Sequence, residues 1–482
     1  MSVFKRNIIY NTLLSVSQVL FPLITFPYSS RVLGPQAMGS VNFADNFTTY
    51  FLLISALGIP LYGVREVAKV KDEPERLRKV FSELMLIHLA TSILAVVILF
   101  LISFFIGRLR SEFALYQIGM AVVLGSVFIA EWFFQGTEQF KYIAIRSLAI
   151  RILTIVLLFL LVHTPADKYL FYGLNLMAVI ISAATNMYAI RRVISFTRSE
   201  LSLKRHFRPL LLIFSNSLVT TIYLVFDTII LGFITADVYV GYYAASMRIS
   251  KLSLAVIGAL SAVLLPRLTI AFLNKNYDEA SLLLTKSMNF VVFLSVPIAL
   301  GTLCLSREII QLFAGNQYLP AVYSLQVLCF IVVFVGMAQV FSHQILLPLH
   351  LERNILIASV FGVIVSLVLN FSLIPVYKHV GAALSSLSAE IAVTAVLFLF
   401  ARKASKFSFP VKQLVQSTLT CMIFFLIRFG VLQFTSKAGL IILFTVPVSG
   451  LVYLTIQIFV WRNKHVLEVL SGYAPFKFLL AR

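Results

Sequence analysis

The stretch from Leu84 to Phe105 reads LMLIHLATSILAVVILFLISFF and contains no Lys, Arg, Asp or Glu. A helix rises about 1.5 Å per residue, so a run of this length covers the roughly 30 Å hydrocarbon core of a bilayer. The rest of the chain has the same character, because 60% of its 482 residues are apolar and its mean hydropathy is +0.97. Too few polar residues remain to cover a water-exposed surface. The composition therefore predicts a membrane protein.

Apolar runs long enough to cross a bilayer recur fourteen times along the chain. Only helices and closed barrels satisfy the backbone in lipid, and these runs are too long for barrel strands, so the predicted fold is all-α. No small-residue cleavage site follows the first run, which predicts that this span is retained rather than removed as a signal peptide. The expected spans lie near residues 8–28, 40–62, 80–106, 114–136, 143–163, 170–190, 209–231, 239–264, 287–305, 320–346, 354–375, 379–401, 413–434 and 439–461.

The 39 Lys and Arg residues divide unevenly between alternate loops. With the N-terminus in the cytoplasm, 28 of them lie in cytoplasmic segments and seven in the loops of the opposite side. This is the positive-inside asymmetry of a multi-pass membrane protein, so the net charge of +20 does not indicate nucleic-acid binding. The even number of spans predicts that both termini are cytoplasmic.

A weak internal repeat with an offset of 202 residues relates the two halves of the chain. The stretch VLGPQAMGSVNFA (32–44) aligns with ITADVYVGYYAAS (234–246), and Gly39 falls on Gly241. Six spans separate the two copies, so both have the same orientation and form a parallel repeat of the kind found in transporters. The substrate of such a protein binds in the cleft between its lobes. The expected parts are an N-terminal lobe (1–205), a C-terminal lobe (206–405) and an appendage of two helices (406–482).

Four stretches carry a resemblance to a known family. They are RVLGPQAMGSVNFADNFTTYFLLISALGIPLYGVREVAK (31–69), EWFFQGTEQFKYIAIRS (131–147), YYAASMRISKLSLAVIGALSAVLLPRL (242–268) and IPVYKHVGAALSSLSAE (374–390). In this order and on these spans they resemble the polysaccharide-transporter branch of the multidrug/oligosaccharidyl-lipid/polysaccharide exporter superfamily, specifically the Wzx-type O-antigen flippases.

The resemblance implies two six-helix lobes and alternating access. Its implied substrate is an undecaprenyl-diphosphate-linked oligosaccharide, moved from the cytoplasmic to the periplasmic leaflet of a bacterial inner membrane. The product serves the assembly of O-antigen, and hence lipopolysaccharide, or of a related surface polysaccharide. Membrane lipids, a polysaccharide polymerase and a chain-length regulator are the implied partners. The alternative function is a cation-coupled antiporter of the multidrug type, whose cleft needs a net acidic lining.

Eight charged residues lie deep inside the predicted spans, away from the loops, where a charge costs at least about 2.5 kcal/mol and needs a partner, water or a substrate. Arg248 and Lys251 are three residues apart and share one helical face near mid-membrane. Two like charges at this depth predict a site for the substrate diphosphate, and the alternatives are an ion pair with Asp227 or snorkelling of the side chains toward the interface. Tyr223 and Tyr242 are candidates for stacking on sugar rings, and simple packing is the alternative for both.

The intramembrane carboxylates predict gating, ion coupling or structural ion pairs. Asp45 lies one position from the repeat equivalent of Arg248, so a gate between the lobes is one hypothesis and a shallow, hydrated position for Asp45 is the other. Glu131 and Arg151 lie at comparable depths on consecutive spans, which favours a salt bridge over a proton relay. Glu390 lies near mid-membrane, where it either takes part in cation coupling or pairs with a neighbouring helix.

Two arginines have simpler alternatives to a functional role. Arg31 ends the first span just before Gly34 and Pro35, and it either anchors the helix at the interface or contacts the substrate diphosphate. Arg428 lies on the thirteenth span, where a contact to a lipid headgroup or to the main bundle is expected.

Other function classes are disfavoured by what the sequence lacks. The three cysteines and seven histidines form no metal-ligand spacing, and there is no P-loop. No loop is long enough for a soluble catalytic domain, so we expect no enzymatic activity and no cofactor. The intramembrane carboxylates permit coupling to H⁺ or Na⁺ without requiring it.

Overall fold

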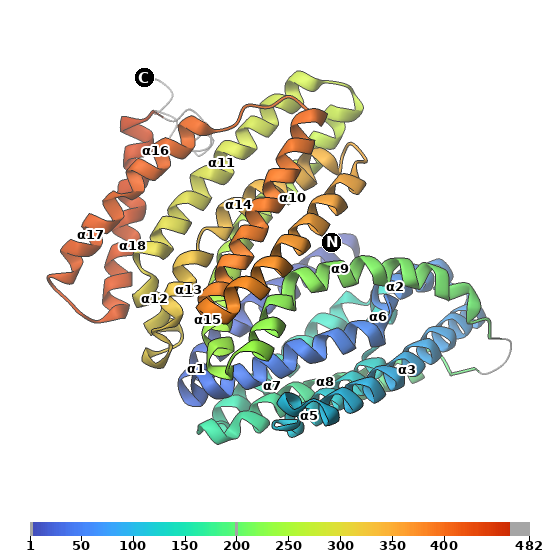
Figure 1. Ribbon diagram of the computed structural model, residues 1–482. Coiled ribbons are helices and arrows are strands. Elements are labelled where there is room, and N and C mark those ends of the chain that lie inside the picture. Colours follow the sequence, from blue (N-terminus) through green and yellow to red (C-terminus); the bar gives the residue numbers. More distant parts are fainter. Residues whose placement is uncertain (1–2, 198–200, 463–482) are drawn as a thin grey trace. The chain divides into compact units, whose positions relative to one another are not determined.

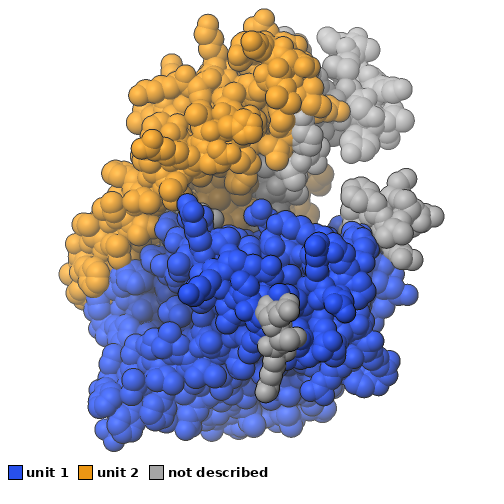
Figure 2. Space-filling model, turned by 90° about the vertical axis from the view of Figure 1, so that its right-hand side faces the viewer, with its two compact units in different colours: residues 1–241 blue, residues 242–482 orange. Residues whose placement is uncertain are grey.

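The computed structural model describes residues 3–197 and 201–462 (Figure 1). Within these ranges every regular element is a helix, as the sequence predicts, and no strand occurs. The chain divides into two compact units, residues 1–241 and residues 242–482 (Figure 2). The division falls inside one long helix, and the predicted lobe boundaries at residues 205 and 405 stay a prediction.

Unit 1 is a bundle of long helices joined by short turns. Its elements are α1 (Val3–Ala56), α2 (Ile59–Val70), α3 (Pro74–Phe105), α4 (Gly107–Arg110), α5 (Phe113–Ile129), α6 (Glu131–Gly136), α7 (Phe140–Leu161), the 3₁₀ turn Pro165–Asp167, α8 (Lys168–Arg191), α9 (Lys204–Ile234) and the start of α10 (Asp237–Leu273). α5 packs along α8, and α3 packs against both α1 and α5. Lys168 pairs with Glu112 at 2.5 Å, so α8 and α5 begin at the same end of the unit.

α1 covers two predicted spans, 8–28 and 40–62, in one element. Its backbone leaves helical geometry at Gly34 (φ 71°, ψ 173°). A positive φ suits glycine, which has no Cβ, and the following Pro35 also disfavours a helical conformation at this position. The break therefore lies where the sequence places the first turn between spans.

Unit 2 contains the rest of α10 and the remaining helices. These are α11 (Tyr277–Cys304), α12 (Ser306–Phe313), the 3₁₀ turn Asn316–Tyr318, α13 (Ala321–Leu328), α14 (Ile331–Gln339), the π-helix Val340–Leu346, α15 (Glu352–Ala404), α16 (Val411–Cys421), α17 (Ile423–Leu432), α18 (Ala438–Thr455) and the π-helix Ile456–Val460. α11 packs against α14 and α16, and α17 packs against α18.

α15 is two helices that meet at a tight turn. Its backbone leaves helical geometry at Lys378 (φ 52°, ψ −127°), three residues after Pro375. A Cβ added to Gly381 lies 2.6 Å from the carbonyl carbon of Leu373, although eight residues of straight helix rise about 12 Å. The chain therefore turns back on itself between the predicted spans 354–375 and 379–401.

Ten helical segments, counted over the described residues, are long and apolar enough to cross a membrane. Their outer surfaces are apolar, as on α3, where Ile93, Leu94 and Val97 are about half exposed. Rows of exposed aliphatic side chains avoid water and are typical of helices that face lipid. The chain is therefore a multi-pass membrane protein.

Candidate functional site

Arg248 and Lys251, the predicted diphosphate ligands, lie one turn apart on α10 in unit 2. The Arg248 side chain is half-buried and acts electrostatically on the hydroxyl of Tyr318, whereas Lys251 is exposed. Tyr242 contacts Tyr318, with ring centroids 6.1 Å apart, and His379, at 5.3 Å. The structure thus brings one predicted sugar-stacking residue and one predicted cation to the same tyrosine.

Two further tyrosines, Tyr223 and Tyr243, lie on the same two helices as the predicted site, α9 and α10. The side chain of Tyr223, the other predicted stacking residue, lies outside the described residues. Tyr243 is only 2% exposed, and its hydroxyl lies 2.7 Å from the hydroxyl of Ser386. Tyr243 is therefore a packed residue of the unit 2 core.

The predicted gating and coupling carboxylates lie in different parts of the chain. Asp45 is exposed on α1 and Asp227 is half-buried on α9, both in unit 1. The Asp227 carboxylate acts electrostatically on the hydroxyl of Tyr50, which places it close to α1. Glu390 is half-buried on α15 in unit 2. Because Asp45 and Arg248 belong to different units, their pairing as a gate stays a prediction.

Glu131 forms its salt bridge with a different arginine from the one predicted. Its carboxylate lies 2.7 Å from Nη2 of Arg146, whose Nη1 donates to Oδ1 of Asn186 at 2.5 Å. Arg151 instead places its guanidinium 5.9 Å from the ring centroid of Phe21. Five residues turn a helix by about 140° beyond one full turn, so Arg146 and Arg151 point to different faces of α7. The salt bridge within this hairpin is present, but Arg151 as its partner is wrong.

The two arginines with simpler predicted roles both make local contacts. Arg31 is exposed, and its Nη1 donates to the carbonyl oxygen of Pro27 at 3.0 Å, a bond that suits an interfacial anchor. Arg428 donates to Oε1 of Glu308 through Nη2 at 2.6 Å and Nε at 3.2 Å. Glu308 is 3% exposed and lies on α12. The expected contact of Arg428 to the main bundle is confirmed.

The structure contains a buried ion cluster around Glu83, a residue that is not among the charges predicted to lie in the membrane. Glu83 on α3 is fully buried, and its carboxylate accepts from the backbone N–H of Ser202 at 2.6 Å and lies 2.9 Å from Nε2 of His206. Arg205 completes the cluster with an ion pair to the same carboxylate. The signal in the sequence is a glutamate four residues inside the predicted span 80–106, close to a basic loop. The cluster ties the start of α9 to α3.

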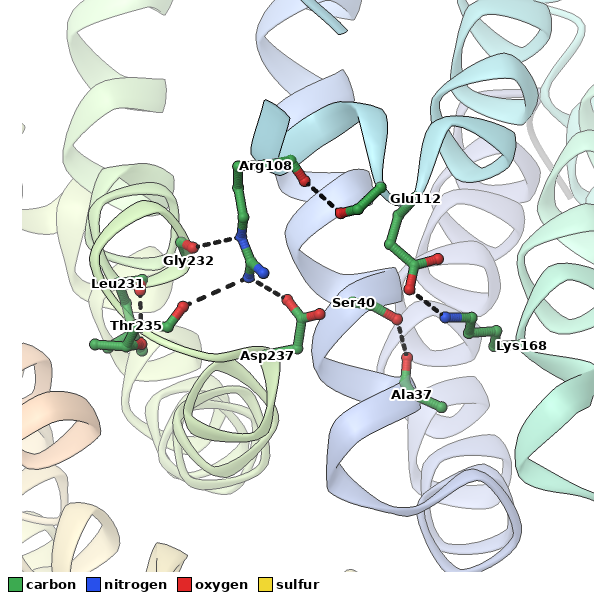
Figure 3. Close-up of polar contacts among 10 residues, drawn as sticks. Ala37, Ser40, Arg108, Glu112, Lys168, Leu231, Gly232, Thr235 and Asp237 are labelled. Atoms are coloured by element: carbon green, nitrogen blue, oxygen red, sulfur yellow. Dashed lines mark hydrogen bonds and ion pairs between the residues drawn. The ribbon is translucent and has the colours of Figure 1, made fainter. Parts of the chain in front are cut away.

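A second polar cluster joins the turn after α3 to the turn between α9 and α10 (Figure 3). Arg108 on α4 pairs with Asp237 at 2.5 Å, and it also donates to the carbonyl oxygens of Gly232 at 3.1 Å and Thr235 at 3.5 Å. These carbonyls belong to the C-terminal end of α9, which carries a partial negative charge and lacks helical partners. Arg108 therefore caps α9 and holds the first residue of α10 with one guanidinium. In the sequence, Arg108 lies in the loop between the predicted spans 80–106 and 114–136, where no pattern indicates this contact.

The two glycines aligned by the repeat lie at a close crossing of α1 and α10. A Cβ added to Gly39 lies 2.6 Å from the carbonyl carbon of Asp237, and one added to Gly241 lies 2.9 Å from the carbonyl carbon of Pro35. Pro35 and Asp237 are themselves 202 residues apart, so each copy of the repeat makes the same contact with the other. All four residues belong to unit 1, so the crossing is a feature of that unit.

The described residues offer no group of three or more His, Cys, Asp or Glu side chains that could hold a metal ion. Cys304, Cys329 and Cys421 are buried and separate.

Comparisons with known proteins agree with this architecture. The family model described as polysaccharide biosynthesis protein matches residues 4–272. A protein of Escherichia coli K12 is 24% identical over 404 residues, covering 83% of this chain and 96% of the relative. A protein of Shigella dysenteriae is 25% identical and covers 83% and 100%. Both relatives are provisionally named O-antigen transporters.

Two kinds of solved structure share the fold. The lipid II flippase MurJ, in an inward closed conformation, aligns with a TM-score of 0.72 at 17% identity, covering 95% of this chain and 99% of that one. An inward-facing multidrug transporter of the MATE family aligns with a TM-score of 0.65 at 14% identity, covering 80% and 94%. The match to the family model confirms the resemblance carried by the four sequence stretches. The chain belongs to the polysaccharide biosynthesis protein family.

Proposed function

We propose that this chain is a flippase for a lipid-linked oligosaccharide in the bacterial inner membrane. The observation that carries the proposal is the match of the polysaccharide biosynthesis family over residues 4–272. The names of the relatives and the transporter fold support the same function. The substrate class is an undecaprenyl-diphosphate-linked repeat unit, moved from the cytoplasmic to the periplasmic leaflet for O-antigen or a related polysaccharide.

The architecture behind this function has fourteen spans in two parallel six-helix lobes and a two-helix appendage, with both termini cytoplasmic. The breaks at Gly34 and Lys378 support counting α1 and α15 as two spans each. The contacts of Gly39 with Asp237 and of Gly241 with Pro35 pair equivalent positions of the 202-residue offset, which supports the internal repeat. A parallel repeat of this kind is typical of transporters that open alternately to either side of the membrane.

The substrate diphosphate is bound by Arg248 and Lys251, with Arg31 as a further contact at the membrane surface. A guanidinium offers two parallel donors to a phosphate, and an ammonium adds a point charge, so the pair suits a diphosphate better than a cationic drug. Tyr223 and Tyr242 supply faces for sugar rings, and Tyr242 packs on Tyr318, on whose hydroxyl Arg248 acts. Asp45 takes part in gating, and Asp227 and Glu390 are the carboxylates through which transport can couple to H⁺ or Na⁺.

Partners on the periplasmic side complete the process. A polysaccharide polymerase that consumes the flipped repeat unit, with a chain-length regulator, draws the transport cycle forward by removing product. This supply of free energy makes coupling to an ion gradient optional rather than necessary.

The decisive experiment measures on which membrane face lipid-linked repeat units collect when the gene is deleted and then replaced by variants. Deletion is expected to trap repeat units on the cytoplasmic face. Lys251→Ala is expected to lower transport at least about tenfold, because one charge-assisted phosphate contact is lost, and Lys251→Arg is expected to retain most of it. Lys437→Ala, an exposed cation in the turn before α18, is the matched control. Unchanged sidedness after deletion contradicts the function, and a normal Lys251→Ala variant contradicts only the site.

A further inference from the structure

A cavity of about 820 Å³ lies between α7 and α8 in unit 1, apart from the predicted substrate residues. Its wall along α7 is apolar and is formed by Ile145, Ala149 and Leu153. Its other end, at the start of α7, is polar and is formed by Lys141 and Arg146. The volume is in the range of small-molecule sites, which are mostly apolar with a few polar groups that fix the orientation of the ligand. This cavity has that composition along a single axis.

The cavity opens sideways onto a surface that suits lipid. Ile145 is 55% exposed and Leu153 is 39% exposed at its rim, and Ile152, just outside it, is 61% exposed. An aqueous substrate channel is lined by polar groups, whereas an aliphatic rim of this kind is stable against hydrocarbon chains. A molecule that enters from this side comes from the bilayer.

The polar end of the cavity contains a buried donor that lacks an acceptor. The Arg146 side chain is 8% exposed, and its Nη atoms are held by Glu131, Asn186 and Ser147. Its Nε is buried and has no hydrogen-bond partner among the described residues. A buried N–H without a partner is costly and rare, so this guanidinium, which lines the cavity, favours an acceptor close to it.

The charges around that donor favour an anionic acceptor. Glu138, at the polar rim, is engaged by Lys71 at 2.8 Å, a hydrogen bond that raises the pKa of Lys71. Glu131 is likewise engaged by Arg146. Lys141 is exposed at the same rim and makes no ion pair with another described residue. With both carboxylates paired, the ammonium of Lys141 is the charge at this rim that remains to bind a ligand, beside the guanidinium of Arg146.

We propose that this cavity is a binding site for an anionic glycerophospholipid of the surrounding bilayer. Its phosphate accepts from Nζ of Lys141 and lies toward the Arg146 guanidinium, which lines the same cavity, and an acyl chain follows the wall of Ile145, Ala149 and Leu153. A free phosphate ion gains nothing from the apolar wall, and a lipid without a phosphate offers no anionic acceptor to Lys141. A repeat unit in transit carries a sugar head that needs a wide aqueous path, which a sideways opening between two helices does not provide. The inference does not depend on the proposed function.

The test measures lipids retained by the purified full-length chain with native mass spectrometry. Phosphatidylglycerol, diacylglycerol with the same acyl chains and a polyprenyl phosphate are offered at equal concentration. Phosphatidylglycerol is expected to be retained at least about tenfold more than diacylglycerol, because only it supplies charge-assisted acceptors. Equal retention of these two lipids overturns the proposal. Preferential retention of polyprenyl phosphate also overturns it, because the occupant is then of the transported class.

Two variants locate the site without disturbing the network around Arg146. Ala149→Trp fills the apolar part from an exposed position, and Lys141→Ala removes the exposed ammonium. Each is expected to lower phosphatidylglycerol retention about tenfold. The matched controls are Ile152→Trp, outside the cavity on the same helix, and Lys412→Ala, an exposed cation on α16 in unit 2; both are expected to bind as the unchanged chain does. Ala149→Trp binding like its control overturns the proposal.

Discussion

Replacing Gly39 by alanine tests whether the crossing of α1 and α10 is a true backbone contact. The added methyl carbon lies 2.6 Å from the carbonyl carbon of Asp237 and closer still to its oxygen, whereas ordinary contacts begin at 3.4 Å. The obstacle is main chain, which cannot rotate away as a side chain can. Because the oxygen is the nearest obstacle, the two helices must separate by more than about 1 Å at this point.

The expected cost follows from overpacking. Extra methylenes in a tight core cost about 1–3 kcal/mol, and a rigid backbone obstacle places Gly39→Ala at the upper end, about 3 kcal/mol. The entropy of unfolding is about 2.1 cal/mol/K per residue, or about 1 kcal/mol/K for 482 residues. If the chain unfolds as one unit, the melting temperature falls by about 3 °C. Gly241→Ala should cost a similar amount, because its methyl meets the carbonyl of Pro35 in the same way.

The assay is thermal unfolding of the purified chain in detergent, with Gly173→Ala as the control. Gly173 lies inside α8 with nothing within 4 Å of an added Cβ, so alanine there should gain about 0.5–1 kcal/mol from helix propensity alone. The Gly39→Ala, Gly241→Ala double variant should lose less than the sum of the two single losses, because the first substitution already separates the helices. Strict additivity, or a Gly39→Ala variant as stable as the control, refutes the reciprocal contact.

Three further predictions concern the ion pairs. Arg428→Met leaves the carboxylate of Glu308 buried without its cation and should cost about 3–5 kcal/mol in chemical denaturation, and adding Glu308→Gln should recover much of the loss. Asp237→Ala should cost less, about 1–3 kcal/mol, because Arg108 is 31% exposed and keeps its bonds to the end of α9; a loss as large as that of Arg428→Met would contradict this ranking. Glu83→Gln should increase proteolysis just before α9, because the Glu83 carboxylate accepts from Ser202 and pairs with Arg205 there. Limited digestion followed by mass spectrometry measures the cleavage rate. Equal cleavage rates in the variant and the unchanged chain would contradict a role of Glu83 in holding this segment.

The helices could be predicted from the sequence because the bilayer leaves the backbone few alternatives. Long apolar runs in hydrocarbon must be helical, and their length is fixed by the thickness of the membrane. The turn at Gly34 and Pro35 was also readable, since glycine tolerates a positive φ and the residue before a proline avoids helix. The turn at Lys378 was placed by the spans on either side of it rather than by its own chemistry.

The contacts of the charged side chains could not be predicted in the same way. Glu131 pairs with Arg146 rather than Arg151 because the two arginines lie on different faces of α7. The predicted depth of a residue in the membrane does not say on which face of its helix it lies. The pairing of Arg108 with Asp237 joins residues 129 positions apart through the packing of three helix ends. Glu83 pairs with Arg205 and His206 because the chain packs the start of α9 against α3. These residues are more than 120 positions apart in the sequence, and no local pattern indicates that they meet.

The crossing at Gly39 and Gly241 also limits how the sequence of unit 1 can change. At both positions the nearest atoms of the other helix are main-chain atoms, which no choice of rotamer can move aside. Small residues at such a crossing let the helix backbones approach closely, and any larger residue at either position keeps them apart. Two positions 202 residues apart in the sequence are thereby held to the smallest side chain for the same reason.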